Sequence, residues 1–192
     1  MKSLFAFGLL PFLLILGFLT PMEEEVTKEI ASSQIDWKGY KVTGSHTGTV
    51  DLKDGSLKFD EKGNLTGGKI VMDMTSITVT DLTGEYKGKL EGHLKSDDFF
   101  GIANHPTATL VIKDVAAKGT PGDYKVTGDL TIKDQTKEIK FYANVVDNVA
   151  TAELKIDRSE YNVRYGSGSF FDGLGDKTIY DEFDINVKLM LK

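Results

Sequence analysis

Three histidines, His46, His93 and His105, are the side chains best suited to acid–base chemistry in this cysteine-free chain. Three imidazoles can hold a zinc ion and leave one position open, but the spacing of these three follows no metal-site pattern. We therefore predict no metal site and no cofactor. His46 or His93 could instead act as the general base of a hydrolase or isomerase with an apolar substrate. Because the chain lacks G-x-S-x-G, phosphate-loop and dinucleotide-binding motifs, we predict a protein that is not an enzyme.

Both arginines of the chain, Arg158 and Arg164, flank one short segment. A guanidinium offers a planar fork that fits phosphate or carboxylate. Together with His46, the two arginines are therefore candidates to hold the head group of an apolar ligand. The competing interpretation is a structural ion pair with a nearby acid such as Asp157 or Asp172, and this is the commoner use of such arginines.

Two stretches interrupt an otherwise regular pattern, residues 90–107 and residues 157–178. Each contains a pair of phenylalanines, Phe99-Phe100 in the first and Phe170-Phe171 in the second. We expect both stretches to close over one end of the fold. The phenylalanine pairs either fill an ordinary core or line a cavity, and the sequence leaves both interpretations open.

Those stretches need a framework, and alternating apolar and polar residues supply it. Ile70, Met72 and Met74, for example, share one face of a segment whose other face is mostly polar, as in a half-buried antiparallel strand. Similar segments recur from residue 36 to the end, and Asp54-Gly55 is expected to turn a hairpin. The pattern predicts eight or nine antiparallel strands in a barrel or a sandwich. A barrel is favoured because closure removes exposed strand edges.

Residues 81–100 break this alternation. Leu82, Tyr86, Leu90 and Leu94 recur every four residues, which predicts a short helix with one apolar face. Asp81 is expected to cap its start. A frayed helix or a loop is the alternative.

The net charge of the chain and its N-terminal residues limit the partners and the cellular location that we expect. A net charge of −6 argues against nucleic acid as a partner and against docking on anionic lipid by charge. Residues 4–19 carry no charge and follow Lys2, which is the layout of a secretory signal. We predict a signal peptide at 1–22, with an uncleaved membrane anchor as the alternative, a flexible spacer at 23–34 and one domain at 35–192. Either leader places the domain outside the cytoplasm.

Four segments of the domain resemble the YceI-like family of polyisoprenoid-binding proteins. They are GSHTGTV (44–50), GHLKSDDFFGIANHPTATL (92–110), GDLTIKDQTKEIKF (128–141) and DRSEYNVRYGSGSFFDGLGD (157–176). The resemblance covers residues 36–192. It implies an extended lipocalin-like antiparallel barrel with a helix near its mouth and a long isoprenoid chain inside. It also implies export to the periplasm.

Taken together, we predict an all-β, lipocalin-like antiparallel barrel of about eight strands with a short helical insertion near residues 81–100. We predict that it binds a long-chain polyisoprenoid, of the polyprenyl phosphate or quinone type, for storage or transport in the cell envelope. The alternatives are the envelope enzyme above and a filled barrel that serves as a protein-binding module. The residues expected to line the cavity for the lipid tail are Phe59, Met72, Met74, Leu90, Leu94, Phe99, Phe100, Leu110, Ile112, Val126, Leu130, Phe141, Leu154, Phe170, Phe171, Phe183 and Ile185.

Overall fold

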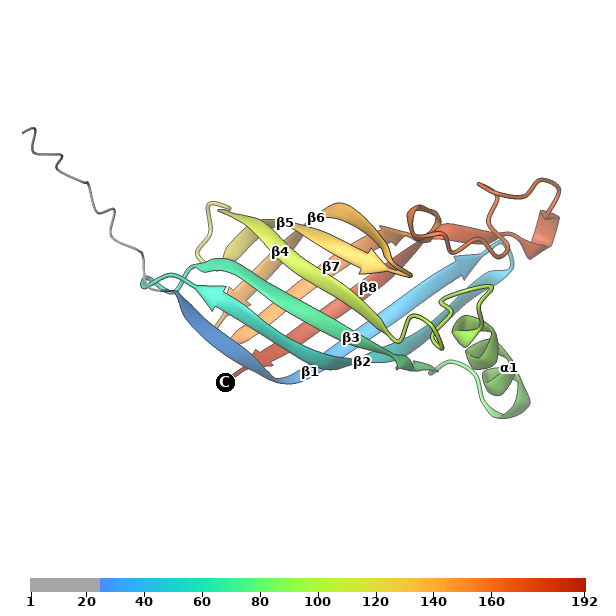
Figure 1. The fold of residues 1–192 in the computed structure, drawn as a ribbon, viewed down its shortest axis with the longest axis horizontal. Helices are drawn as coiled ribbons and strands as arrows, with labels where there is room; N and C mark the ends of the chain where they lie inside the picture. Colours follow the sequence, from blue (N-terminus) through green and yellow to red (C-terminus); the bar gives the residue numbers. More distant parts are fainter. Residues whose placement is uncertain (1–24) are drawn as a thin grey trace, which may run out of the picture.

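The computed structural model describes residues 25–192 and shows a closed antiparallel barrel of eight strands. Each strand pairs with its neighbours in sequence, and the last strand returns to pair with the first (Figure 1). The predicted all-β barrel is therefore confirmed. Its strands are β1 (Val26–Lys41), β2 (Gly44–Phe59), β3 (Leu65–Val79), β4 (Thr107–Ala117), β5 (Asp123–Ile132), β6 (Gln135–Val146), β7 (Val149–Asp157) and β8 (Ile179–Leu191).

The two long insertions lie at the same end of the barrel (Figure 1). Helix α1 (Gly84–Lys95) follows β3, while the 158–178 segment joins β7 to β8 and contains the short 3-10 helices η1 (Arg158–Tyr161) and η2 (Gly175–Lys177). We call this the capped end. The opposite end, the base, carries the turns after β2, β4 and β6 and the end of the chain. Both irregular stretches thus cover one opening, as expected.

Helix α1 confirms the predicted helical insertion, although its start differs from the prediction. The residue before its first turn is Thr83, and Asp81 does not cap it. Asp81 instead bonds to Nδ1 of His46 at 2.8 Å and accepts from the backbone N–H of Thr47 at 3.1 Å. Of the predicted apolar face, Leu94 is buried but Tyr86 is 75% exposed, so the helix packs on the barrel mainly through its C-terminal turn.

The predicted hairpin at Asp54-Gly55 is wrong, because β2 runs straight through both residues. They pair with Val71 and Ile70 of β3, beside a register irregularity. A side chain at Gly55 would bring its Cβ within 2.7 Å of Cδ1 of Ile30. A side chain there would have to displace the flexible end of Ile30 and would lie close to the carbonyl of Lys69. Long-range pairing overrides the local turn signal.

The predicted spacer is also wrong for its described part, because β1 begins at Val26. Val26 pairs with Phe59 of β2, and Ile30 pairs with Leu191 of β8. Strand partners on both sides order this charged stretch despite its small apolar content. The predicted signal peptide at 1–22 lies outside the described residues. No helix within residues 25–192 has the length and apolar character needed to cross a membrane.

Candidate binding cavity

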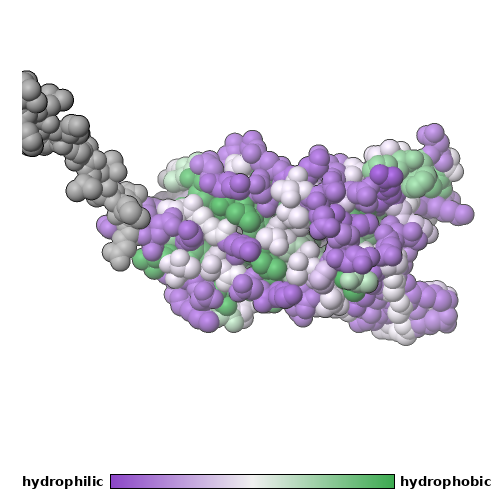
Figure 2. Space-filling model, in the orientation of Figure 1, coloured by the Kyte–Doolittle hydropathy of each residue, from purple (hydrophilic) through white to green (hydrophobic). Residues whose placement is uncertain are grey.

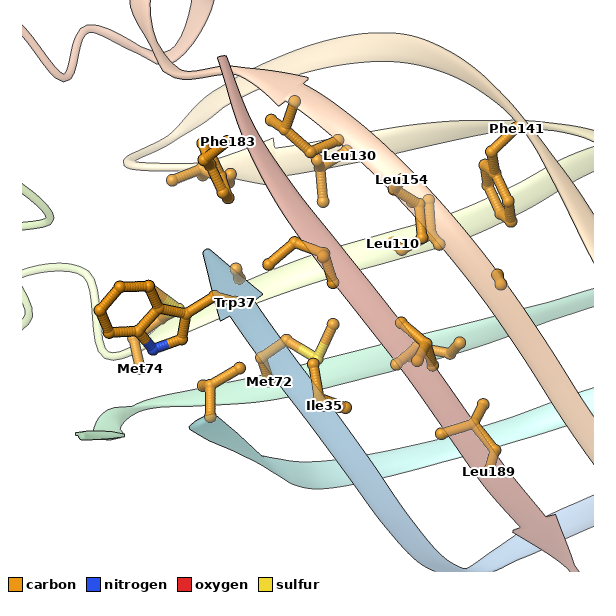
Figure 3. A pocket seen from close by; sticks show the side chains of 18 of the residues that line it. Ile35, Trp37, Met72, Met74, Leu110, Leu130, Phe141, Leu154, Phe183 and Leu189 are labelled. Atoms are coloured by element: carbon orange, nitrogen blue, oxygen red, sulfur yellow. The ribbon is translucent and has the colours of Figure 1, made fainter. Parts of the chain in front are cut away.

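The inside of the barrel holds a cavity of about 180 Å³ that every strand helps to line. An engineered apolar cavity of roughly 150 Å³ stays dry and binds benzene. The barrel interior is therefore not filled to the density of an ordinary core. Figure 3 shows apolar side chains that converge on this space. One from each strand in turn is Ile35, Val50, Met72, Leu110, Leu130, Phe141, Leu154 and Phe183.

The structure brings together most of the residues that the sequence predicts as tail contacts. They share the inward face of an alternating strand or the underside of the capped end. The predicted residues that line the cavity are Met72, Met74, Leu94, Phe99, Phe100, Leu110, Ile112, Val126, Leu130, Phe141, Leu154, Phe183 and Ile185.

Four predicted residues do not line this cavity. Phe59 is buried at the base, where the ammonium of Lys28 lies 5.3 Å from its ring. Leu90 packs half-buried against the outside of the core. Phe170 and Phe171 are 39% and 50% exposed at the capped end, where Figure 2 shows hydrophobic surface. The prediction that this pair lines a cavity is wrong, because it lies on a turn around Ser167 that faces outward.

Several lining residues were missed by the sequence interpretation, chiefly Trp37 and Gly39. They continue the inward face of β1 from Ile35, so the period of two residues could have found them. The indole N–H of Trp37 is buried without a hydrogen-bond partner among the described residues. A Cβ at Gly39 would meet no atom within 4 Å, so this glycine leaves space open in the cavity wall.

Phe99 and Phe100 form a roof over the cavity at the capped end. Both are buried, and their rings meet edge to face with centroids 5.0 Å apart. Nζ of Lys133, in the turn between β5 and β6, donates to the carbonyls of Phe99 at 2.8 Å and Asp97 at 3.1 Å. Burial lowers the pKa of the Lys133 ammonium. The backbone N–H of Phe100 donates to the carbonyl of Leu94, so the roof is hydrogen-bonded on two sides.

Arg158 is the one charged residue among the described residues that line the cavity, and it is 2% exposed. Its guanidinium donates to the carbonyl oxygens of Val163 at 2.8 Å, Ile179 at 3.0 Å and Tyr180 at 3.2 Å. Its Nη2 also lies 3.4 Å from Oδ1 of Asp181. Burial lowers the pKa of Arg158, although an arginine stays charged at any ordinary pH. The guanidinium therefore ties the 158–178 segment to the start of β8. Its acidic partner is Asp181, whereas the sequence suggested Asp157 or Asp172.

The other two head-group candidates lie away from the cavity. Nε of Arg164 donates to Oδ1 of Asn162, and its guanidinium lies 5.0 Å from the ring of the exposed Phe170. Nδ1 of His46 lies 2.8 Å from Oδ2 of Asp81, on the outer rim of the barrel. The structure does not bring Arg158, Arg164 and His46 together, so they form no common anion site.

The remaining histidines lie behind the roof and do not line the cavity. The His93 ring sits between the rings of Phe99 and Tyr165, at centroid distances of 5.6 and 4.1 Å. Burial lowers the pKa of His93; the charge of Asp98 opposes this shift, and the charge of Arg158 adds to it. His105 lies with Nδ1 3.1 Å from a carboxylate oxygen of Asp134. No histidine of the described chain is placed to act as a base on a molecule in the cavity.

Comparison with known proteins identifies the barrel. Residues 26–191 match the model of the YceI-like domain. The chain belongs to the YceI-like family. The YceI-like domain thus covers all eight strands and both insertions.

Relatives of this YceI-like chain include a UPF0312 protein of Pectobacterium atrosepticum, 31% identical over 52% of this chain and 48% of the relative. Protein YceI of Salmonella newport is 26% identical over 76% of this chain and 73% of the relative. The alignment spans about half the length of the first of these curated relatives.

Solved structures of the same fold include Burkholderia cenocepacia BcnA, with a TM-score of 0.66 and 24% identity over 82% of this chain and 94% of that one. A polyisoprenoid binding domain from Saccharophagus degradans has a TM-score of 0.59 and 15% identity over 88% and 99% of the two chains. At these identities the likeness establishes the fold.

Proposed function

We propose that this YceI-like protein binds a long-chain polyisoprenoid lipid inside its barrel, leaves it chemically unchanged, and stores or transports it in the cell envelope. The observation that carries the proposal is the unfilled space of about 180 Å³ with apolar side chains from every strand around it. The structure from Saccharophagus degradans, which is described as a polyisoprenoid binding domain, has the same fold and supports this ligand class.

The tail of such a lipid should dominate its affinity. Burial of one CH₂ group contributes about 0.8 kcal/mol, so a five-carbon isoprene unit contributes on the order of 3 kcal/mol before the costs of binding. A charge-assisted hydrogen bond contributes roughly 1.5–3 kcal/mol. Two isoprene units therefore outweigh one polar contact to the head group.

A chain longer than a few isoprene units needs more room than the present cavity offers. Met72 and Met74 both line the space, and methionine adapts its shape through three rotatable bonds. These two side chains are therefore the part of the lining best suited to move aside for the tail.

The structure favours an uncharged head group of the quinone type over a phosphate. Arg158 already donates to three carbonyls and faces Asp181, so it has little capacity left for an anion. The rest of the lining is mostly apolar, and among the described residues it contains no second cation. An ion transferred into such surroundings without a partner carries a large desolvation cost.

A location outside the cytoplasm is part of the proposal and rests on the sequence of residues 1–22. The same reasoning allows the leader to remain as a membrane tether. Protease protection in intact and permeabilised cells tests this part, because an exported domain is digested once the outer barrier alone is opened.

The chain supplies its own reporter for ligand binding, because its single tryptophan, Trp37, lines the cavity. Titration with a long-chain prenylated benzoquinone should quench Trp37 fluorescence to saturation. A polyprenyl phosphate with the same tail should bind at least about tenfold more weakly, a difference of about 1.4 kcal/mol. No saturable quenching by the quinone would contradict the proposal, and tighter binding of the phosphate would contradict the assignment of the head group.

A further inference from the structure

The pairing between β6 and β7 stops partway along the barrel. It runs from Val146 opposite Val149 to Tyr142 opposite Glu153. Toward the capped end, residues 135–141 of β6 pair only with β5, and residues 154–157 of β7 pair only with β8. The ladder of backbone hydrogen bonds is therefore interrupted between these two segments, and we call this interruption the β6–β7 slot.

The charges on the two strands explain why the pairing ends there. If the register continued past Tyr142 and Glu153, Lys140 would stand opposite Lys155, and Glu138 opposite Asp157. All four of these side chains point outward and are exposed. Like charges directly opposite each other destabilise an antiparallel pair, so this sequence disfavours closure of the slot.

Those charges find partners without crossing the slot. Nζ of Lys155 lies 2.8 Å from Oδ1 of Asp184, on the neighbouring strand β8. Nζ of Lys140 lies 3.0 Å from Glu138, on its own strand. Asp157 accepts from the backbone N–H of Ser159 at 2.9 Å. The open arrangement thus leaves no charge in need of a partner on the other side.

The short helix η1 lies beside the slot. Helix η1 follows β7 directly and lies against β6. Its Tyr161 is fully buried, yet the hydroxyl has no hydrogen-bond partner, and burial raises its pKa to about 12. Within the described chain, no hydrogen bond or ion pair joins residues 135–141 to residues 154–162. The two segments can therefore separate without the loss of a hydrogen bond or an ion pair between them.

A route along the barrel axis through the capped end is closed by hydrogen bonds. Lys133 holds the carbonyl of Phe99, and Arg158 ties the 158–178 segment to the start of β8. At the same end β3 also extends beyond β4, but there Glu91 of α1 accepts from the backbone N–H of Val79 at 2.9 Å. The β6–β7 slot is the part of this rim that lacks such bonds among the described residues.

The cavity reaches both borders of the slot. Phe141 of β6 and Leu154 and Ile156 of β7 all line it. A chain that passed between the two strands would therefore move directly from solvent or a membrane surface into apolar surroundings.

We propose that the β6–β7 slot is the entrance through which an apolar chain passes sideways into the cavity, while η1, which lies against β6, moves aside. This inference rests on the proposed lipid-binding function. Repulsion between Lys140 and Lys155 disfavours continued pairing of β6 with β7. The roof keeps its hydrogen bonds while the lipid enters.

A disulfide across the slot tests the proposal cleanly, because the chain has no cysteine of its own. The variant Lys140→Cys/Lys155→Cys joins the two strands on their outer faces, where the bridge leaves the cavity volume unchanged. The matched control is Tyr142→Cys/Glu153→Cys, which bridges the last pair that is already in register. Each protein is mixed with phosphatidylcholine vesicles that contain a long-chain prenylated benzoquinone, and the rate of Trp37 quenching is followed.

The oxidised Lys140→Cys/Lys155→Cys protein should take up the quinone at least about tenfold more slowly than its reduced form. Dithiothreitol should restore the rate, and the control should show no difference between its two forms. Lys140→Glu provides a second measurement without a disulfide. It places opposite charges across the slot and should slow uptake about twofold to fivefold.

The possible outcomes separate this inference from the function on which it rests. Unchanged uptake rates in both slot variants, with normal final quenching, overturn the entrance and leave lipid binding intact. If the disulfide does not form, the rate of Lys140→Glu decides. No quenching even in the unmodified protein overturns the proposed function itself.

Discussion

Replacement of Arg158 by alanine separates a structural role of its guanidinium from a role in binding a head group. The substitution removes the donors to the carbonyls of Val163, Ile179 and Tyr180 and leaves Asp181 without its cation. Breaking a buried charge pair by removal of one partner costs about 3–5 kcal/mol. For a chain of this size, each kcal/mol corresponds to roughly 2–4 °C in Tm. The Arg158→Ala protein should therefore melt about 6–20 °C lower.

Urea denaturation followed by Trp37 fluorescence measures this loss as a shift in the midpoint. Arg164→Ala is the matched control, because Arg164 is exposed and bonds only to its neighbour Asn162, and its effect should stay within about 0.5 kcal/mol. Arg158→Lys should fall between, since an ammonium keeps the charge but cannot span three carbonyls.

Two results would refute the reasoning about Arg158. One is an Arg158→Ala protein that unfolds at the same urea concentration as the wild type. The other is a folded Arg158→Ala protein that loses affinity for a polyprenyl phosphate but keeps its affinity for a quinone with the same tail.

Three further substitutions test the cavity, the roof and the buried histidine. Gly39→Phe should fill open space in the cavity and lower quinone affinity at least about tenfold. It should change the free energy of unfolding by no more than about 1 kcal/mol. Unchanged quenching of Trp37 by the quinone would contradict the expected loss of affinity. Lys133→Met should lower the urea midpoint by the equivalent of about 1 kcal/mol, because the roof loses its hydrogen bonds to the Phe99 and Asp97 carbonyls. Burial lowers the pKa of His93 below its usual 6.5. As the pH decreases through that value, the unfolded chain binds more protons than the folded chain, so the folded protein becomes less stable. His93→Phe should reduce the stability lost between about pH 7 and pH 5, and an identical pH profile in both proteins would show that His93 carries none of it.

The strands of the barrel were predictable because alternation is a local signal. In β5, for example, Tyr124, Val126, Leu130 and Ile132 all point inward and are buried. A shift of one residue would turn the whole set to solvent, so the pattern fixes the register as well as the strand. Most of the cavity lining followed from the same argument.

Features that depend on contacts between distant segments could not be predicted from the sequence. Asp54-Gly55 has the composition of a turn, but pairing with β3 extends it. Phe170 and Phe171 are as apolar as Phe99 and Phe100, yet only Phe99 and Phe100 are enclosed, by the end of α1, Lys133 and Arg158. The sequence of a loop does not show whether its apolar side chains will be buried by other segments of the protein.

The β6–β7 slot belongs to the same class of features. Lys140 and Lys155 are ordinary surface lysines until the register is known, and only then do they face each other across an interrupted pairing. The charge of Arg158 likewise pointed to an anion, whereas its partners are backbone carbonyls that no sequence motif marks.

The most direct test of the central claim is to purify the full chain from its native host and identify what occupies the barrel. Native mass spectrometry followed by lipid extraction gives both the mass of the bound molecule and its chemistry. We expect an uncharged lipid whose fragments are spaced by isoprene units, in a one-to-one complex. A protein that carries no lipid, and that also fails to take up a long-chain quinone from vesicles, would contradict the account.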